Sequence, residues 1–217
     1  MQAEEKNTNE IALQVAKLLL KVKAVKLQPN NPFTWASGWK SPIYCDNRLT
    51  LSYPQIRTYI RQEFVKLIQE EIGDVDLIVG VATGGIAQGA LVAQDMGLPF
   101  AYVRSSEKAH GMTNLVEGVV ESGQRVVIIE DLISTGGSSL KAVEAIRALN
   151  CEVKGLVAIF SYDFDLAKEN FKKAKCKMLT LSNYNALTEQ AFADEFILEK
   201  DLESLKKWRK DPENWGK

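Results

Sequence analysis

Short apolar runs alternate with helical patterns through the middle of the chain. Five such runs lie at residues 76–82, 99–104, 125–130, 155–160 and 177–181, and helical patterns lie between several of them, at 86–96, 138–149 and 165–173. Continuous apolar strands that alternate with helices are typical of a parallel sheet with helices on both faces. The sequence therefore predicts an α/β fold with a mainly parallel five-stranded sheet. Ligands of such sheets bind beyond the carboxyl ends of the strands.

The two ends of the chain predict additions to this sheet. Apolar side chains at helical spacing predict a first helix over residues 9–25. A loop rich in proline, glycine, tryptophan and asparagine follows over 28–51, and Ser52 and Pro54 then begin a second helix. The tail, 197–215, is typical of a charged amphipathic helix that serves packing. Because the chain has 217 residues, we expect one domain.

Composition excludes several classes of protein. Hydrophobic residues make up 46% of the chain and charged residues 25%, which is typical of a globular protein. A net charge of −1 argues against a broad nucleic-acid surface, so any anion site must be local. The three cysteines are widely spaced and predict neither a disulfide framework nor a zinc site. With no signal-like amino terminus and no run long enough to span a bilayer, we expect a cytoplasmic protein without membrane or nucleic-acid partners.

The most informative motif is VVIIEDLISTGGSSL, at Val126–Leu140. An apolar strand ends in two carboxylates, Glu130 and Asp131, which only accept hydrogen bonds and so suit the hydroxyls of a sugar. Gly136 and Gly137 allow a tight turn with backbone N–H groups close to a phosphate. The helix that follows adds unpaired N–H donors and the positive end of its dipole. These parts together predict a ribose 5-phosphate site, and the alternative is an ordinary strand-to-helix connection.

Two other segments at strand ends suit anions. Ala82, Thr83, Gly84 and Gly85 precede a helix and form a possible nest of N–H groups for pyrophosphate, although a tight turn is the alternative. A polar stretch of about fourteen residues begins at the end of the next strand, and loops of this length are usually functional or mobile. It carries cationic and titratable side chains that suit phosphate oxygens; these are Arg104, Lys108 and His110. A solvated surface loop is the alternative.

These motifs resemble those of a known family. The stretch Val126–Leu140 resembles the phosphoribosyl diphosphate (PRPP) motif of the type I phosphoribosyltransferases. The pattern R-x-x-x-K-x-H-G from Arg104 resembles the catalytic loop of the orotate phosphoribosyltransferases. Residues Phe33–Arg48 resemble the amino-terminal hood of that family, F-T-x-x-S-G-x-x-S-P-x-Y. The resemblance covers about residues 10–210 and implies a hood over about 1–52, an α/β core over about 53–195 and a carboxyl-terminal helix over about 196–217.

The resemblance implies a reaction and roles for residues. Orotate and PRPP would give orotidine 5′-monophosphate and pyrophosphate, in de novo pyrimidine biosynthesis. The resemblance implies that Lys108 and His110 are catalytic, that Ser134 also contacts orotate, and that residues 82–85 form the pyrophosphate nest. The implied PRPP-binding residues are Arg104, Lys108, His110, Glu130, Asp131, Leu132, Ile133, Ser134, Thr135, Gly136, Gly137 and Ser138. It further implies Mg²⁺ carried on PRPP with no protein ligands, and a homodimer whose subunits share the catalytic loop.

The chain departs from the family pattern at several positions. Ser105, Gly84 and Ala36 stand where many members carry basic residues, and the arginine that some members place near residues 161–163 is absent. The residue that holds the orotate carboxylate therefore stays open, with Lys40 and Arg48 as candidates. Two other functions also stay open. One is transfer to another base, with the aromatic side chains at 160–164 stacking on it, and the other is a non-catalytic regulator that senses PRPP.

Overall fold

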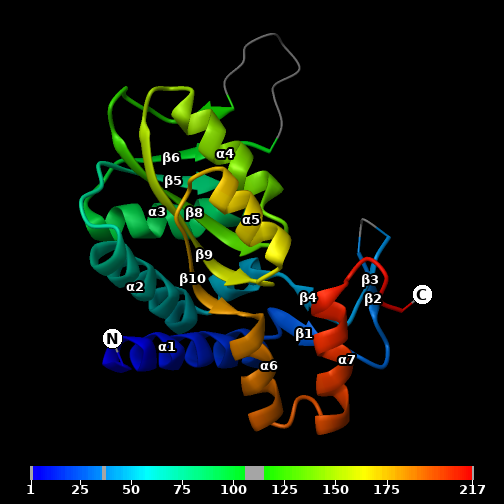
Figure 1. Cartoon of the computed structure of the whole chain (residues 1–217). Coiled ribbons are helices and arrows are strands. Elements are labelled where there is room, and N and C mark those ends of the chain that lie inside the picture. Colours follow the sequence, from blue (N-terminus) through cyan, green and yellow to red (C-terminus); the bar gives the residue numbers. More distant parts are fainter. Residues whose placement is uncertain (1, 36–37, 106–114, 217) are drawn as a thin grey trace. The chain divides into compact units, whose positions relative to one another are not determined.

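The computed structural model describes residues 2–35, 38–105 and 115–216 (Figure 1). The chain forms two compact units. One comprises Tyr53–Leu181 and is called the core unit here. The other comprises Met1–Ser52 with Ser182–Lys217 and is called the terminal unit. Within the described residues, no helix is long and apolar enough to cross a membrane.

A six-stranded sheet in the order β10-β9-β8-β5-β6-β7 organises the core unit. Its strands are β5 (Leu77–Val81), β6 (Phe100–Val103), β7 (Val116–Glu117), β8 (Arg125–Ile133), β9 (Glu152–Ser161) and β10 (Met178–Asn183). β5 runs parallel to β6 and β8, and β8 runs parallel to β9, whereas β7 is antiparallel to β6. The expected α/β class and mainly parallel sheet are confirmed. The expected count of five strands was wrong, because β7 is only two residues long and shows no periodicity in the sequence.

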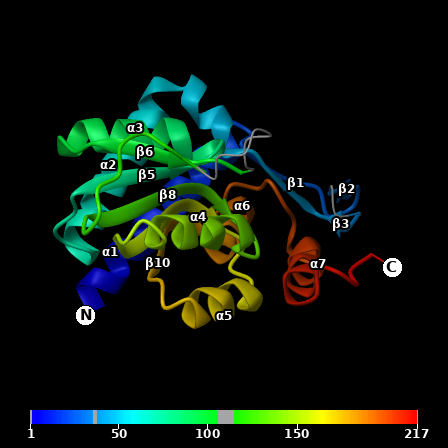
Figure 2. The ribbon, with the colours of Figure 1, turned by 90° about the horizontal axis from the view of Figure 1, so that it is seen from above.

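Helices cover both faces of this sheet. They are α2 (Pro54–Glu71), α3 (Gly84–Met96), α4 (Gly137–Arg147) and α5 (Asp165–Lys173). Figure 2 shows α2 and α3 on one face and α4 and α5 on the other. α2 begins at the expected proline, and α5 has the expected bounds. α3 ends at Gly97, whose φ of +66° stops the helix in the left-handed conformation that glycine adopts without penalty.

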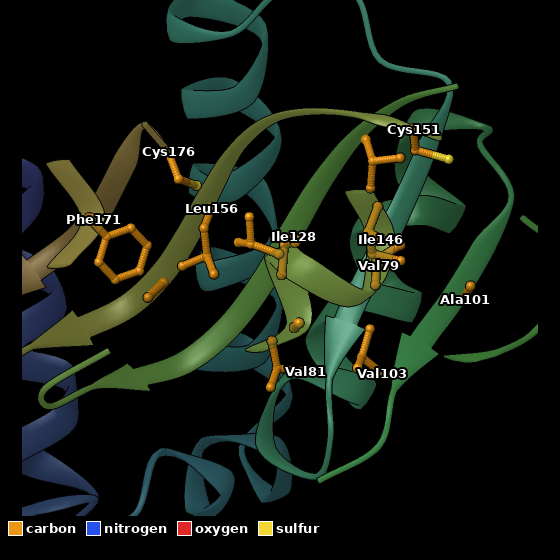
Figure 3. Close-up of a cluster of buried hydrophobic side chains, with 14 of the residues drawn as sticks. Val79, Val81, Ala101, Val103, Ile128, Ile146, Cys151, Leu156, Phe171 and Cys176 are labelled. Carbon is orange, nitrogen blue, oxygen red and sulfur yellow. The ribbon is translucent and has the colours of Figure 1, made fainter. Parts of the chain in front are cut away.

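The hydrophobic core between the sheet and α4 and α5 explains the unbroken apolar runs. Val79, Ile128 and Leu156 come from three adjacent strands and are fully buried. Figure 3 shows them between Ile146 of α4 and Phe171 near the end of α5. Since the other face of the sheet is covered by α2 and α3, neither face of these strands is left for polar side chains.

The terminal unit contains short strands and three helices. α1 (Gln2–Lys21) packs against α6 (Tyr184–Ala193), and α7 (Glu199–Lys210) follows α6. β1 (Val25–Leu27) pairs antiparallel with β4 (Ile43–Cys45), and β2 (Phe33–Thr34) with β3 (Lys40–Ser41). A 3₁₀ helix, Asn47–Ser52, ends the segment. The sequence predicted the helices at both ends with shifted bounds. It missed α6 and β1, and it treated β2, β3 and β4 as loop.

α7 is fixed to the β2–β3 hairpin segment by its buried face. The fully buried ring of Trp208 meets Trp35 edge-on with centroids 5.6 Å apart, and packs against Tyr184 at 5.4 Å. Asp201 accepts hydrogen bonds from the Leu198 N–H at 3.0 Å and from the Asn30 side-chain amide at 3.2 Å. The tail helix therefore packs as an integral part of the terminal unit.

We expect Trp208→Ala to destabilise the protein by about 3–5 kcal/mol, because it removes a fully buried indole and leaves a cavity. The matched control is Trp215→Ala, since Trp215 is partly exposed and should cost much less. Urea unfolding followed by circular dichroism measures both free energies of unfolding. Equal losses in the two variants would contradict the packing role of α7.

Candidate active site

Three neighbouring parallel strands end at one edge of the core sheet. β5 lies between β6 and β8. The segments identified in the sequence lie at the ends of these strands. Ala82–Gly85 comes after β5, and Arg104 comes after β6. The acidic pair, Glu130 and Asp131, lies near the end of β8. The Ala82 N–H donates to the Val103 carbonyl at 2.8 Å, which joins the ends of β5 and β6. The structure thus brings the described parts of all three segments to one edge.

The two adjacent carboxylates of β8 point to opposite faces of the sheet, as consecutive strand residues do. Glu130 faces α4, where the Ser139 hydroxyl donates to its Oε2 at 3.0 Å. Its Oε1 accepts the Asp131 N–H at 3.0 Å, and the residue is only 4% exposed. Glu130 therefore joins the end of β8 to the first turn of α4, and its carboxyl group is largely withdrawn from solvent.

Asp131 instead faces the start of α3. A Cβ atom added to Gly84 would collide with the Asp131 carboxylate, and one added to Gly85 would collide with the Ile129 carbonyl oxygen. Both glycines are thus needed for the first turn of α3 to lie against β8. The half-buried Asp131 carboxylate lies directly beside Gly84 in the segment Ala82–Gly85, whose Ala82 N–H already donates to Val103.

Burial changes the protonation of Glu130. Desolvation, followed by the negative charge of Asp131, raises the pKa of Glu130 from 4.5 to about 8. The hydrogen bonds from the Asp131 N–H and the Ser139 hydroxyl oppose this shift but do not cancel it. The raised pKa favours the protonated form of Glu130, which lowers the negative charge that the two carboxyl groups present to the site.

The loop after β8 leads directly into α4. Gly136 is the N-cap residue with a φ of +84°, a conformation that favours glycine. Its carbonyl accepts the Leu140 N–H at 2.9 Å, and no side chain caps this helix among the residues that the structure describes. The first-turn N–H groups of Gly137 and Ser138 have no helical acceptor, and both residues are exposed. The loop can therefore present backbone donors and the positive end of the helix dipole to an anion.

The remaining residues between Asp131 and Gly136 differ in how far their side chains are buried. Ile133 is fully buried in the hydrophobic core, so its side chain is not available to a ligand. Its carbonyl accepts the Tyr162 N–H at 3.1 Å, which ties the end of β8 to the segment after β9. Leu132, Ser134 and Thr135 are half-buried, and Ser134 lies between the end of β8 and the glycine turn.

α5 supports this loop from the side. The Asn170 side-chain amide donates to the Thr135 carbonyl at 3.1 Å. The Phe171 ring lies against Gly136, where an added Cβ would come within 2.8 Å of Phe171 Cε2. Two consecutive residues of α5 thus contact two consecutive residues of the loop.

Arg104 lies at the start of the predicted catalytic loop. Its N–H donates to the Leu115 carbonyl at 2.7 Å, and its guanidinium lies 3.6 Å from Glu117 Oε1 on β7. The arginine is half-buried. Lys108 and His110 lie outside the described residues, within 106–114.

The two candidates for the orotate carboxylate lie in the terminal unit and have partners there. Lys40 Nζ donates to Thr34 Oγ1 at 2.9 Å. The Arg48 guanidinium donates two hydrogen bonds to Asp46, at 2.7 and 2.9 Å, and it holds the pKa of that carboxyl below its usual value. An incoming carboxylate would therefore compete with Asp46 for Arg48.

Sequence reasoning missed four residues that organise this edge: Ser139, Asn170, Phe171 and Glu117. Ser139 was detectable, because strand alternation turns Glu130 towards the following helix and Ser139 lies on the first turn of that helix. Asn170 is 35 residues from the carbonyl it binds, and no local pattern reports such a contact.

Comparison with known proteins agrees with this geometry. The family described as "Phosphoribosyl transferase domain" matches residues 53–196. The orotate phosphoribosyltransferase of Porphyromonas gingivalis is 60% identical over 202 residues, which cover 93% of this chain and 96% of that protein. The chain belongs to the orotate phosphoribosyltransferase family.

Solved structures of this family have the same fold. The orotate phosphoribosyltransferase of Aeropyrum pernix is 27% identical with a TM-score of 0.73, over 81% of this chain and 97% of that one. The UMP synthase of Leishmania donovani is also 27% identical, with a TM-score of 0.77. That match covers 91% of this chain but only 42% of the longer synthase. The family membership predicted from the three motifs is confirmed.

The raised pKa of Glu130 predicts a pH dependence of stability. The unfolded chain loses this proton near pH 4.5, whereas the folded chain keeps it up to about pH 8. The stabilisation from the folded-state proton is therefore complete below pH 4.5 and is lost as the pH rises through 8. We expect the free energy of unfolding of the wild type to fall between pH 5 and pH 9.

Glu130→Gln, which does not titrate, should lose much of that pH dependence in urea unfolding. Glu144→Gln is the control, because Glu144 is an exposed glutamate on the neighbouring helix α4, and it should behave as the wild type. A Glu130→Gln variant with the full wild-type pH dependence would show that Glu130 is ionised in the folded protein.

Proposed function

We propose that this chain transfers the 5-phosphoribosyl group of PRPP to orotate, giving orotidine 5′-monophosphate and pyrophosphate. This reaction belongs to de novo pyrimidine biosynthesis and is a pentosyl transfer. The observation that carries the proposal is the sheet edge at which β8, its glycine loop and the start of α3 meet, in a chain 60% identical to an orotate phosphoribosyltransferase.

The loop after β8 would hold the ribose 5-phosphate. Thr135–Ser138 supply hydroxyls and backbone N–H groups at the positive end of α4, where a phosphate is stabilised without a cationic side chain. Asp131 would accept hydrogen bonds from the ribose hydroxyls. Glu130, buried against Ser139, would act mainly by fixing the strand end from which Asp131 projects.

The leaving pyrophosphate would lie by the nest of Ala82–Gly85. As it departs from the anomeric carbon, negative charge builds on its oxygens and the ribose becomes oxocarbenium-like, so positioning and electrostatics govern the rate. Arg104 would bind phosphate oxygens through its planar fork. On the evidence of the sequence motif, Lys108 would stabilise the departing pyrophosphate and His110 would assist as a donor.

Mg²⁺ fits this site as an ion brought in on PRPP. Among the residues that the structure describes, no group of three His, Cys, Asp or Glu side chains could hold a metal ion. The described groups near the glycine loop are N–H groups, hydroxyls and the Asp131 carboxylate, and this set suits a phosphate ligand better than a protein cage for the ion. When bound, the ion would neutralise charge on the pyrophosphate.

Ser134 is the proposed contact for orotate, and Lys40 and Arg48 are proposed for its carboxylate. Arg48 would have to share its guanidinium with Asp46. We also propose a homodimer in the cytoplasm whose subunits share the loop that carries Lys108 and His110.

The structure disfavours the alternative of a stacked purine. Phe160, Tyr162 and Phe164 were the aromatic side chains considered for stacking on a base. Tyr162 and Phe164 are only 3% and 6% exposed, and Tyr162 packs against the other two rings at 5.7 and 5.6 Å. Because these rings pack on each other, they leave no open face for a base.

The decisive assay follows the loss of orotate absorbance with purified protein, PRPP and Mg²⁺, each component being omitted in turn. We expect consumption that requires all three and releases one pyrophosphate per orotate. Consumption of adenine, guanine, hypoxanthine or uracil instead would assign a different base. PRPP binding without consumption of any base would favour the PRPP-sensing regulator.

We expect Lys108→Ala to lower kcat by roughly 10²–10³, by analogy with the loss of one preorganised charge-stabilising donor. Lys206→Ala, which removes an exposed lysine from α7, should leave kcat unchanged. Steady-state kinetics with saturating PRPP and orotate measure both variants. An unchanged kcat in Lys108→Ala would remove Lys108 from catalysis.

Asp131→Asn should weaken PRPP binding by roughly 10-fold or more, because an acceptor oxygen becomes a donor facing a sugar hydroxyl and a charge-assisted bond is lost. Calorimetric titration with PRPP and Mg²⁺ measures the affinity. The same affinity in the variant and the wild type would exclude Asp131 from the ribose site.

A further inference from the structure

We propose that Asn170 is a positioning residue that sets the conformation of the loop Ser134–Gly137 before the phosphate binds. This inference rests on the proposed binding of a ribose 5-phosphate by that loop. Asn170 lies on α5, outside the sequence motif, and acts through the backbone of the loop rather than on the ligand.

The hydrogen bond of Asn170 fixes the orientation of one peptide unit. Its side-chain amide donates to the Thr135 carbonyl at 3.1 Å, so this carbonyl is directed at α5. In a trans peptide unit the C=O of one residue and the N–H of the next point in opposite directions. The N–H of Gly136 therefore points away from α5, and the Thr135 carbonyl oxygen is kept from turning towards a bound anion.

This peptide unit needs such a restraint because it is followed by glycine. Gly136 has a φ of +84° and would reach many other conformations if the loop were free. If this peptide unit flipped, the Thr135 carbonyl oxygen, which repels phosphate, would take the place of the Gly136 N–H donor. If the loop had to be ordered on binding, the affinity for phosphate would fall by the cost of that ordering.

The neighbouring contacts of α5 act in the same direction. The Phe171 ring lies against the Cα of Gly136, so the loop cannot move towards α5. At the far end of α4, the Arg147 guanidinium donates to the carbonyls of Ala174 and Lys175 at 2.7 and 3.1 Å. The last turn of α5 thus contacts the loop through Asn170 and Phe171, and the two residues that follow the helix are bound to the far end of α4. These contacts hold in place the turn from which Asn170 reaches Thr135.

Two variants separate the hydrogen bond from the shape of the side chain. Asn170→Leu keeps a similar volume without a donor, and Asn170→Asp keeps the shape but turns the donor into an acceptor. Lys172→Gln is the matched control, because it changes the net charge by the same amount as Asn170→Asp from an exposed position on the same helix.

Each protein is titrated with ribose 5-phosphate and, separately, with pyrophosphate and Mg²⁺. We expect both Asn170 variants to bind ribose 5-phosphate about 3- to 10-fold more weakly, the loss typical of one hydrogen bond. Pyrophosphate, which has no 5-phosphate, should bind them as it binds the wild type. In steady-state kinetics, KM for PRPP should rise while kcat changes little, and Lys172→Gln should leave all of these values unchanged.

Three results would overturn the proposal. Unchanged ribose 5-phosphate affinity in both variants would show that Asn170 does not set the loop, while the phosphate site itself would stand. Equal weakening of both ligands, together with a lower melting temperature, would assign Asn170 a general structural role. A wild type that binds PRPP but not ribose 5-phosphate would remove the phosphate from this loop, and with it both the site and this inference.

Discussion

The alternation of side chains at the end of β8 is the constraint on which the site depends. Because consecutive strand residues face opposite sides, Glu130 and Asp131 have different neighbours. Glu130 is buried against Ser139 and fixes the first turn of α4. Asp131 lies against the first turn of α3 and stays half-buried at the edge. One residue therefore anchors the first turn of α4, while its neighbour is the proposed acceptor for the ribose hydroxyls.

Close packing of α3 on the sheet brings Ala82–Gly85, the segment proposed for pyrophosphate, to the same edge. Gly84 and Gly85 have no side chains to hold the helix away from Asp131 and from the Ile129 carbonyl. The nest of Ala82–Gly85 and the loop after β8 consequently lie on adjacent strands, β5 and β8. A molecule with phosphate groups at both ends of a ribose suits two such segments with a carboxylate near them. The raised pKa of Glu130 lowers the negative charge that this molecule would meet.

Much of the fold and part of the site could be predicted from the sequence. The unbroken apolar runs identified every strand of the sheet except β7, which has two residues and hence no period. The strands of the terminal unit are also short, with two or three residues each. α6 was missed although its Asn183 cap is typical of a helix start. Local motifs located the acidic pair and the glycine loop. Contacts between distant segments, such as Asn170 with Thr135, became visible only in the structure. The burial of Glu130 was implicit in strand alternation.

The most direct test of this active site is to follow the backbone amide signals of the loop after β8 while a ligand binds. Proton–nitrogen correlation spectra of the labelled protein would be recorded during titration with ribose 5-phosphate and then with PRPP and Mg²⁺. We expect large chemical-shift changes for the N–H groups of Thr135–Ser139 with both ligands. The N–H groups of Thr83–Gly85 should shift only when the pyrophosphate group is present. Shifts from PRPP that leave both segments unchanged would contradict the assignment of this sheet edge as the active site.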